Sequence, residues 1–261
     1  MRIGLSSAAF YGRMETEEEA ARTAALDVPC CEVFLETFSE YSGDFGREVR
    51  ARLGETECVS VHPKGTQFES DLFGRSRRQV EDAMAWFAGV CDAGRALGAK
   101  YYIFHGPPGL HGPMAPGKIH ALAPTMARLR DIAGARGMEV LWENVYWCAL
   151  RTPEQVAEAI TLTPETRFTL DIKQAYRSGV TPEAMLEAMG DRLRHIHALD
   201  CRADGSLCLP GEGDVDWPGL MRRLKAMGYA GDVILEPYES QARDEAALRR
   251  SLGYLNSLLH L

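Results

Sequence analysis

The stretch Val140-Leu141-Trp142-Glu143 is a short apolar run that ends on a side chain able to bind a metal ion or transfer a proton. The same pattern recurs in Val59-Ser60-Val61-His62, Ile103-Phe104-His105, Phe168-Thr169-Leu170-Asp171, His195-Ile196-His197 and Val233-Ile234-Leu235-Glu236. The carboxyl ends of the strands of a parallel barrel all open onto one mouth, where the active site lies. These repeated polar endings therefore indicate an enzyme whose chemistry takes place at the mouth of a barrel.

Strand-like and helix-like segments alternate along the chain. The expected strands are residues 3–6, 31–36, 58–62, 101–105, 139–143, 167–171, 192–197 and 232–236, and the expected helices are residues 16–26, 45–53, 75–97, 116–136, 153–160, 182–190, 216–227 and 243–259. Eight such units in 261 residues match the roughly 250 residues of a (β/α)8 barrel. We predict one α/β domain over residues 1–261, folded as a TIM barrel. An open doubly wound sheet fits less well, because no Gly-x-Gly-x-x-Gly follows the first strand.

Three connections are long and rich in Gly or Pro, and all of them follow expected strands. They are residues 62–73, 106–117 and 201–213. Long loops on the catalytic face of a rigid scaffold usually serve as lids or binding loops. We therefore expect them to border the active site.

The composition excludes several classes of protein. The formal charge of −8 and the pI near 5.5 argue against a nucleic-acid-binding surface, which needs clustered Lys and Arg. No run approaches about 18 consecutive apolar residues, and the first thirty or so residues lack a secretory pattern. The seven cysteines include no Cys-x-x-Cys, which fits reduced thiols. We expect a cytoplasmic protein with no nucleic-acid partner and no membrane association.

Alternation along the strands places four polar side chains inside the barrel. They are Glu143, Asp171, His197 and Glu236, each of which follows an apolar neighbour that would pack outward. Three desolvated carboxylates around one imidazole repel one another unless a cation lies among them. We therefore predict that these four residues bind one divalent metal ion. The oxygen-rich set suits Mn²⁺, Mg²⁺ or Zn²⁺, and we favour Mn²⁺.

Other polar residues are candidates for binding the substrate. His62 and His105 end their strands and either hold a second metal ion or contact a substrate hydroxyl, which is the interpretation we prefer. Gln174, His195 and Glu36 complete the predicted substrate contacts, although the strand that carries Glu36 can face either way. We expect Lys173, two residues after Asp171, to lie in a solvated loop.

Together, several short motifs resemble the xylose-isomerase-like barrel superfamily. They are Ser60-Val61-His62-Pro63, Phe104-His105-Gly106, Trp142-Glu143-Asn144, Leu170-Asp171, His195-Ile196-His197-Ala198-Leu199-Asp200, Pro210-Gly211-Glu212-Gly213 and Leu235-Glu236-Pro237. The superfamily includes sugar phosphate isomerases, tagatose and psicose epimerases and the endonuclease IV type of phosphodiesterase. The resemblance implies that Glu143 and Glu236 are both metal ligands and the catalytic acid/base pair, exchanging a proton through an enediolate.

The chain departs from the superfamily pattern at Gln174, where many relatives carry His. The endonuclease branch also needs an Asp-x-His where this chain has Gly205-Ser206-Leu207. The resemblance therefore argues against a trinuclear zinc centre. Gln174 also leaves the sugar specificity open.

The resemblance favours a metal-dependent sugar or sugar-phosphate isomerase or epimerase of carbohydrate metabolism. An enolising lyase, such as an inosose- or dehydroshikimate-type dehydratase, is the main alternative, and a phosphodiesterase or a non-catalytic binding protein ranks below it. The partner in the preferred case is a small sugar or sugar phosphate. Related enzymes often pair through barrel helices, so a homo-oligomer is compatible with the resemblance.

Overall fold

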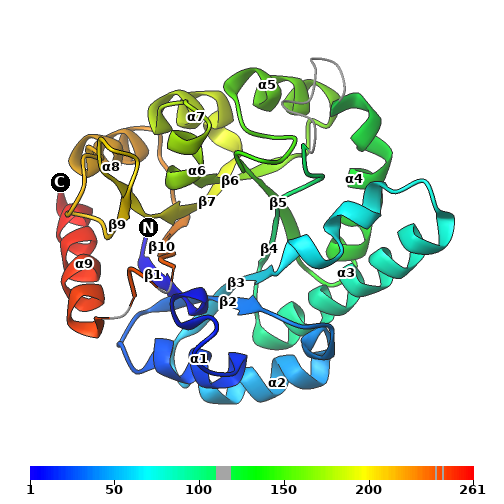
Figure 1. The fold of residues 1–261 in the computed structure, drawn as a ribbon, viewed down its shortest axis with the longest axis horizontal. Helices are drawn as coiled ribbons and strands as arrows, with labels where there is room; N and C mark the ends of the chain where they lie inside the picture. The colour runs from blue at the N-terminus through cyan, green and yellow to red at the C-terminus, as the bar shows by residue number, and fades with distance from the viewer. Residues whose placement is uncertain (110–118, 239, 243) are drawn as a thin grey trace.

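A closed parallel barrel forms the centre of the molecule. The computed structural model describes residues 1–109, 119–238, 240–242 and 244–261. The barrel strands are β1 (Ile3–Ser6), β2 (Cys30–Leu35), β3 (Glu57–Pro63), β4 (Tyr101–Phe104), β5 (Glu139–Glu143), β6 (Arg167–Asp171), β7 (Leu193–Ala198) and β10 (Asp232–Leu235). Their order around the barrel is β1-β10-β7-β6-β5-β4-β3-β2 (Figure 1). The predicted TIM barrel is confirmed.

Helices surround the strands (Figure 1). The α-helices in the described part of the chain are α1 (Thr16–Ala24), α2 (Gly43–Arg52), α3 (Arg77–Leu97), α4 (Ala123–Gly134), α5 (Pro153–Leu162), α6 (Ile172–Arg177), α7 (Pro182–Met189), α8 (Trp217–Ala226) and α9 (Glu245–Ser257). Short 3-10 helices are η1 (Ser7–Phe10), η2 (Phe38–Glu40), η3 (Gly65–Gln67), η4 (Glu69–Phe73), η5 (Ile119–Leu122), η6 (Gly190–Arg192) and η7 (Leu258–His260). None of the described helices is long and apolar enough to cross a membrane.

Two features of the catalytic face differ from the expectation. Helix α6 starts directly after β6, and a small antiparallel pair, β8 (Asp200–Cys201) and β9 (Leu207–Cys208), lies in the loop after β7. Both elements are too short to show a hydrophobic period. The helix expected over 116–136 is η5 followed by α4, while residues 116–118 and most of the loop expected over 106–117 lie outside the described residues.

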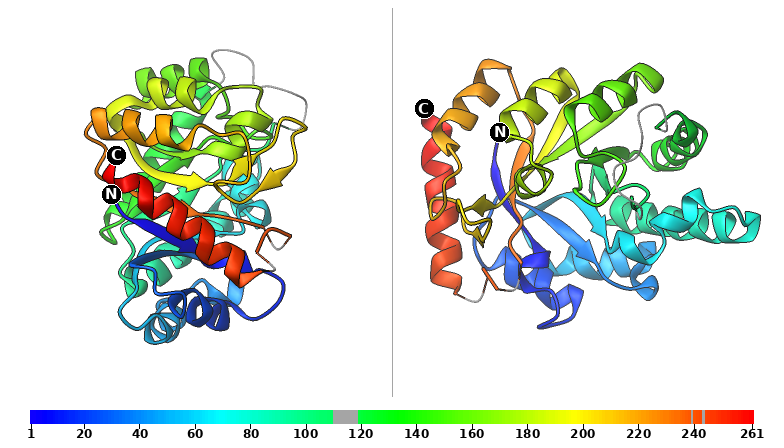
Figure 2. Two further views of the ribbon diagram at one scale, coloured as in Figure 1. Left: turned by 90° about the vertical axis from the view of Figure 1, so that its left-hand side faces the viewer. Right: turned by 45° about the horizontal axis from the view of Figure 1, so that its top comes forward.

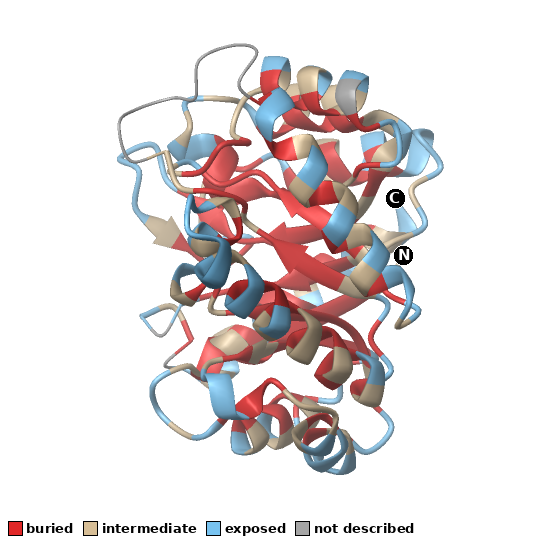
Figure 3. Ribbon diagram, turned by 90° about the vertical axis from the view of Figure 1, so that its right-hand side faces the viewer, coloured by how far each residue is buried: buried red, intermediate tan, exposed pale blue. Residues whose placement is uncertain are grey.

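The apolar core has two parts. The larger part includes Trp142, Leu170 and Ile196, in agreement with the prediction that these residues pack outward from the strands. A separate small cluster of Cys30, Val59 and Ile234 comes from three barrel strands. Figure 3 shows that the strands are almost entirely buried.

The chain closes the barrel by bringing its two ends together. β1 pairs with β10 in parallel, and α9 packs against β1, so that the two termini lie near each other (Figure 2). All the connections that follow the strands reach the same end of the barrel. The side chains at the carboxyl ends of the strands are therefore brought to one place.

The long loop after β7 is held by the buried carboxylate of Asp200. It accepts hydrogen bonds from the backbone N–H groups of Cys201, Gly211 and Val215 at 2.8, 3.1 and 3.1 Å. It also accepts one from Trp217 Nε1 at 2.9 Å. Asp200 thus anchors the loop at the rim of the barrel.

Candidate active site

Four side chains from neighbouring strand ends converge at the mouth of the barrel. Glu143 ends β5, Asp171 ends β6, His197 is in β7 and Glu236 follows β10. One potential ligand atom from each lies within 4.8 Å of the others. All four are buried, with at most 6% of any residue exposed. The structure therefore brings together the four residues for which we predict metal binding.

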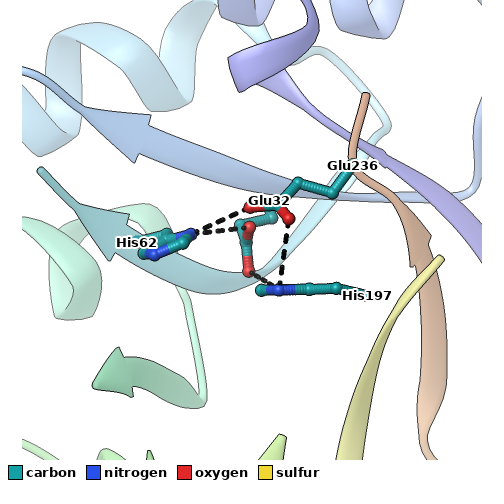
Figure 4. Close-up of side chains that lie close together, drawn as sticks. All are labelled: Glu32, His62, His197 and Glu236. Atoms are coloured by element: carbon teal, nitrogen blue, oxygen red, sulfur yellow. Dashed lines mark hydrogen bonds and ion pairs between the residues drawn. The ribbon is translucent and has the colours of Figure 1, made fainter. Parts of the chain in front are cut away.

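The two ring nitrogens of His197 contact different groups. Its Nδ1 lies 3.1 Å from Glu143 Oε1, 3.5 Å from Glu236 Oε2 and 3.9 Å from Asp171 Oδ2. Its Nε2 lies 3.1 Å from Glu32 Oε2, and Figure 4 shows His197 in contact with both Glu32 and Glu236. Nδ1 is therefore the nitrogen that faces the other three ligand atoms.

Asp171 is held rigidly by its neighbours. Its backbone N–H donates to Asn144 Oδ1 at 2.8 Å, and Asn144 Nδ2 donates to its carbonyl oxygen at 2.9 Å. Its Oδ1 accepts from the backbone N–H of Gln174 at 2.8 Å, which makes Asp171 the N-cap of α6. Its other oxygen, Oδ2, remains turned toward the cluster.

Glu32 lies fully buried at the base of the cluster, and the sequence argument missed it. Its carboxylate accepts hydrogen bonds from Ser60 at 2.8 Å and from Ser6 at 3.2 Å, and it lies 3.4 Å from His62 Nδ1. Burial raises its pKa, but the nearby imidazoles, His197 first, hold the pKa well below the ordinary value. Almost every residue of β2 is buried, so that strand has no polar alternation that would reveal which residues point inward.

Lys173 is buried in the cluster, and the expectation of a solvated loop is wrong. Its side chain is 2% exposed, with Nζ 2.5 Å from Asp171 Oδ2, and it also donates to Glu236 Oε2. The cause is α6, which starts without a connecting loop and so directs its first turn back over the strand ends. A metal ion is therefore not the only cation that can neutralise these carboxylates, because Lys173 lies among them.

Burial and the charged neighbours act in opposite directions on the carboxylates of the cluster. Burial raises the pKa of Asp171 to about 7, and Glu143 and Glu236 reinforce the rise although Lys173 opposes it. Burial alone would also raise the pKa of Glu236, but His197 and Lys173 lower it to about 2. Burial is the largest cause of the raised pKa of Asp171, so the case for a metal ion rests on the donor atoms of the cluster and not on this pKa. The donor set of three carboxylates and one imidazole therefore fits a divalent ion.

His62 and His105 form a second group beside the four ligands. His62 Nδ1 lies 3.3 Å from Glu236 Oε1, and its Nε2 lies 2.8 Å from His105 Nε2. His105 Nε2 is in turn 3.1 Å from Glu143 Oε2. Burial lowers the pKa of His62, but Glu236 and Glu32 outweigh it and raise the pKa to about 10. His62 thus connects one carboxylate of the cluster to His105.

The remaining predicted substrate contacts separate into two groups. Gln174 lines the cavity above the cluster, as do His62 and His105. His195 is fully buried beside Glu32 at 3.4 Å, and Glu36 packs beside Glu40 through its backbone N–H. Neither His195 nor Glu36 is among the residues that line this cavity.

A cavity of about 340 Å³ opens above the cluster, within the usual range for small-molecule sites. Aromatic side chains form much of its wall, and they are Tyr11, Phe34, Trp147 and Tyr238. Glu143, Glu236 and Lys173 also line it. Such a site suits a small ligand with one polar, oxygen-rich part and a ring face that packs against aromatic groups.

Comparison with curated proteins identifies relatives that are enzymes. The family model described as a xylose isomerase-like TIM barrel matches residues 20–258. The inosose dehydratase of Clostridium beijerinckii is 24% identical over 141 residues, which are 46% of this chain and 47% of that enzyme. The inosose dehydratase of Clostridium botulinum is 21% identical over 230 residues, or 76% of each chain. This chain therefore spans about half the length of the first relative and about three quarters of the second.

Solved structures resemble the chain over almost its whole length. A D-psicose 3-epimerase of Clostridium cellulolyticum H10, solved with D-tagatose, has a TM-score of 0.79 at 16% identity and covers 99% of both chains. The IolI protein, solved with a zinc atom, has a TM-score of 0.77 at 18% identity and covers 99% of this chain and 98% of its own. At such identities the similarity shows the fold alone.

Proposed function

Because this chain belongs to the xylose isomerase-like TIM barrel family, we propose that it is a metal-dependent dehydratase of a small polyhydroxylated ketone. The curated relatives named above are inosose dehydratases, which favours the lyase alternative over the isomerase or epimerase expected first. The observation that carries the proposal is the continuous connection Glu236–His62–His105 along the cavity. It links a carboxylate base to an imidazole acid.

The metal ion would be held by Glu143, Asp171, His197 and Glu236. When bound, it would polarise the substrate carbonyl as a Lewis acid. The structural relative solved with zinc is consistent with a metal site in this fold. Mn²⁺ remains the ion we favour, because three of the four ligand atoms are carboxylate oxygens.

Glu236 is the proposed base. Its depressed pKa of about 2 keeps it ionised at neutral pH, and it lines the cavity. It would remove the proton from the carbon next to the carbonyl, breaking that C–H bond while the electron pair moves toward the carbonyl. Glu143 is ionised as well, since its pKa is held well below the ordinary value: burial raises it, but His197 and His105 outweigh burial.

His105 is the proposed acid for the leaving group. Its side chain is 16% exposed and borders the cavity. It would donate a proton to the β-hydroxyl, which leaves as water while a carbon–carbon double bond forms. His62, which its pKa of about 10 keeps protonated, would give its Nε2 proton to His105 Nε2 at 2.8 Å, while its Nδ1–H stays 3.3 Å from Glu236 Oε1. Glu236 would release the proton it has taken to solvent, and His62 would take one back from solvent, so both groups are restored for the next turnover.

The test is turnover of inosose, with D-tagatose and D-psicose as alternative substrates, by Mn²⁺-loaded protein. NMR should show loss of water from the cyclic ketone, whereas inversion of a ketose at one carbon would make the enzyme an epimerase. No reaction with any of the three would count against the proposal.

Two variants separate the proposed roles. Glu236→Gln should stop both proton exchange at the carbon beside the carbonyl and water loss, by about 10² or more. His105→Gln should slow water loss by a similar factor while exchange of that proton with solvent continues. Equal loss of both reactions in His105→Gln would remove His105 from the leaving-group role.

A further inference from the structure

Lys173 brings a positive charge to the same atoms that would bind a metal ion. Its Nζ contacts Asp171 Oδ2 and Glu236 Oε2. These are also two of the three carboxylate oxygens that face His197 Nδ1, at 3.9 and 3.5 Å. An ammonium group and a divalent ion in this cluster would therefore share two of the four ligand atoms.

The backbone keeps Lys173 beside these oxygens. Asp171 caps α6 through the N–H of Gln174 at 2.8 Å, so Lys173 occupies the second position of a helix that is fixed to the end of β6. Its side chain is 2% exposed. The second group near its Nζ is the ring of Tyr238, whose centre is 5.2 Å away and which lines the cavity. The aromatic face offers the ammonium a favourable position outside the carboxylate pair.

We propose that Lys173 is a built-in competitor for the metal position, which neutralises Asp171 and Glu236 when no divalent ion is bound and is displaced from them when one binds. The inference rests on the metal site of the proposed function. It assigns to this lysine a role that neither the sequence motifs nor the named relatives provide.

Two consequences follow from the shared oxygens. A divalent ion must break two buried, charge-assisted hydrogen bonds before it binds, so the lysine weakens metal affinity. Without the lysine, the desolvated carboxylates would repel one another in the apo protein. Lys173 therefore lowers the affinity for the metal ion and stabilises the fold of the metal-free protein.

The experiment compares wild type with Lys173→Met, which keeps an unbranched side chain one atom shorter and removes the charge. Mn²⁺ affinity is measured by calorimetry, and the Tm is measured in EDTA and with excess Mn²⁺. We expect Lys173→Met to bind Mn²⁺ about tenfold more tightly or better. We also expect its Tm in EDTA to fall by roughly 5–10 °C, because buried charges lose their partner, and to recover with Mn²⁺.

Two further variants control for the loss of a lysine and for misfolding. Lys64→Met removes a lysine of the same cavity whose Nζ donates to Tyr11 Oη at 2.7 Å, and it should leave Mn²⁺ affinity unchanged. The double variant Lys173→Met/Glu236→Gln removes one negative charge together with the positive one. It should recover most of the Tm lost in EDTA, even if Lys173→Met alone folds poorly.

The outcomes separate the inference from the proposed function. Equal or weaker Mn²⁺ binding by Lys173→Met, or an unchanged Tm in EDTA, would overturn the competition while leaving the metal site intact. Failure of both wild type and Lys173→Met to bind Mn²⁺ would refute the metal-dependent function, and the competition with it.

Discussion

Glu32→Gln tests how the buried carboxylate beneath the cluster affects the metal ligand His197. Glu32 Oε2 accepts the hydrogen bond of His197 Nε2 at 3.1 Å, which turns Nδ1 toward the other three ligand atoms. A carboxylate in this position orients the ring and raises its basicity as a ligand. The glutamine side chain is nearly the same size and can still accept the hydrogen bond, but it carries no charge.

The size of the effect follows from that difference. A hydrogen bond to a charged group contributes about 1.5–3 kcal/mol, and one between neutral groups about 0.5–1.5 kcal/mol. Glu32→Gln should therefore weaken Mn²⁺ binding by roughly 1–1.5 kcal/mol, or about tenfold. This lies at the lower end of the 10- to 100-fold range usual for groups that hold a metal ligand.

Calorimetric titration with Mn²⁺ measures the change, and the circular dichroism spectrum shows whether the fold is kept. Ser60→Ala is the matched control, because it removes the 2.8 Å hydrogen bond to Glu32 and leaves the charge in place. It should change the affinity by less than about threefold. Wild-type affinity in folded Glu32→Gln, or equal losses in the two variants, would refute the reasoning.

Three further predictions concern metal content, stability and nucleic acid. Asp171→Ala should lose most of the one equivalent of metal expected by elemental analysis, and full retention would exclude Asp171 as a ligand. Glu19→Gln should stabilise the protein at pH 7 by at most about 3 kcal/mol, because burial first and Glu36 second raise the folded-state pKa of Glu19 from 4.5 to about 9. The free energy of unfolding should therefore fall as the pH rises from about 4.5 to about 9. Denaturant titrations at several pH values should show a shallower fall in Glu19→Gln. The exposed control Glu18→Gln should show the same fall as wild type. No Zn²⁺-dependent nicking of abasic DNA is expected from this acidic chain, and efficient nicking would contradict the assignment.

The alternation of strands and helices and the positions of the strand ends were predictable from the sequence. In β7, for example, His195 and His197 alternate with the buried Ile196, and one periodicity fixes which side chains point inward. The same alternation placed Glu143 and Glu236 on the inner face, and both lie in the cluster. The pattern of a single strand is enough for this prediction, because its alternation of polar and apolar residues indicates which side chains face the interior of the barrel.

The contacts that cross between distant segments were not predictable. Glu32 lies on a strand without polar alternation, and the position of Lys173 depends on the immediate start of α6 after β6. The contacts of His62 with Glu236 and His105 depend on the distances between three different strand ends. Such features follow from the curvature and stagger of the closed barrel, which no single segment encodes.

In the proposed reaction, a base on this chain removes the proton next to a carbonyl and a hydroxyl then leaves as water. The most direct test is mass spectrometry of the product formed in ordinary water by Mn²⁺-loaded protein from inosose deuterated at the carbon beside the carbonyl. Proton removal by Glu236 predicts a product that is lighter than the substrate by one water and has released its deuterium to the solvent. A product that retains the deuterium on a neighbouring carbon, or one that has lost no water, would contradict the account.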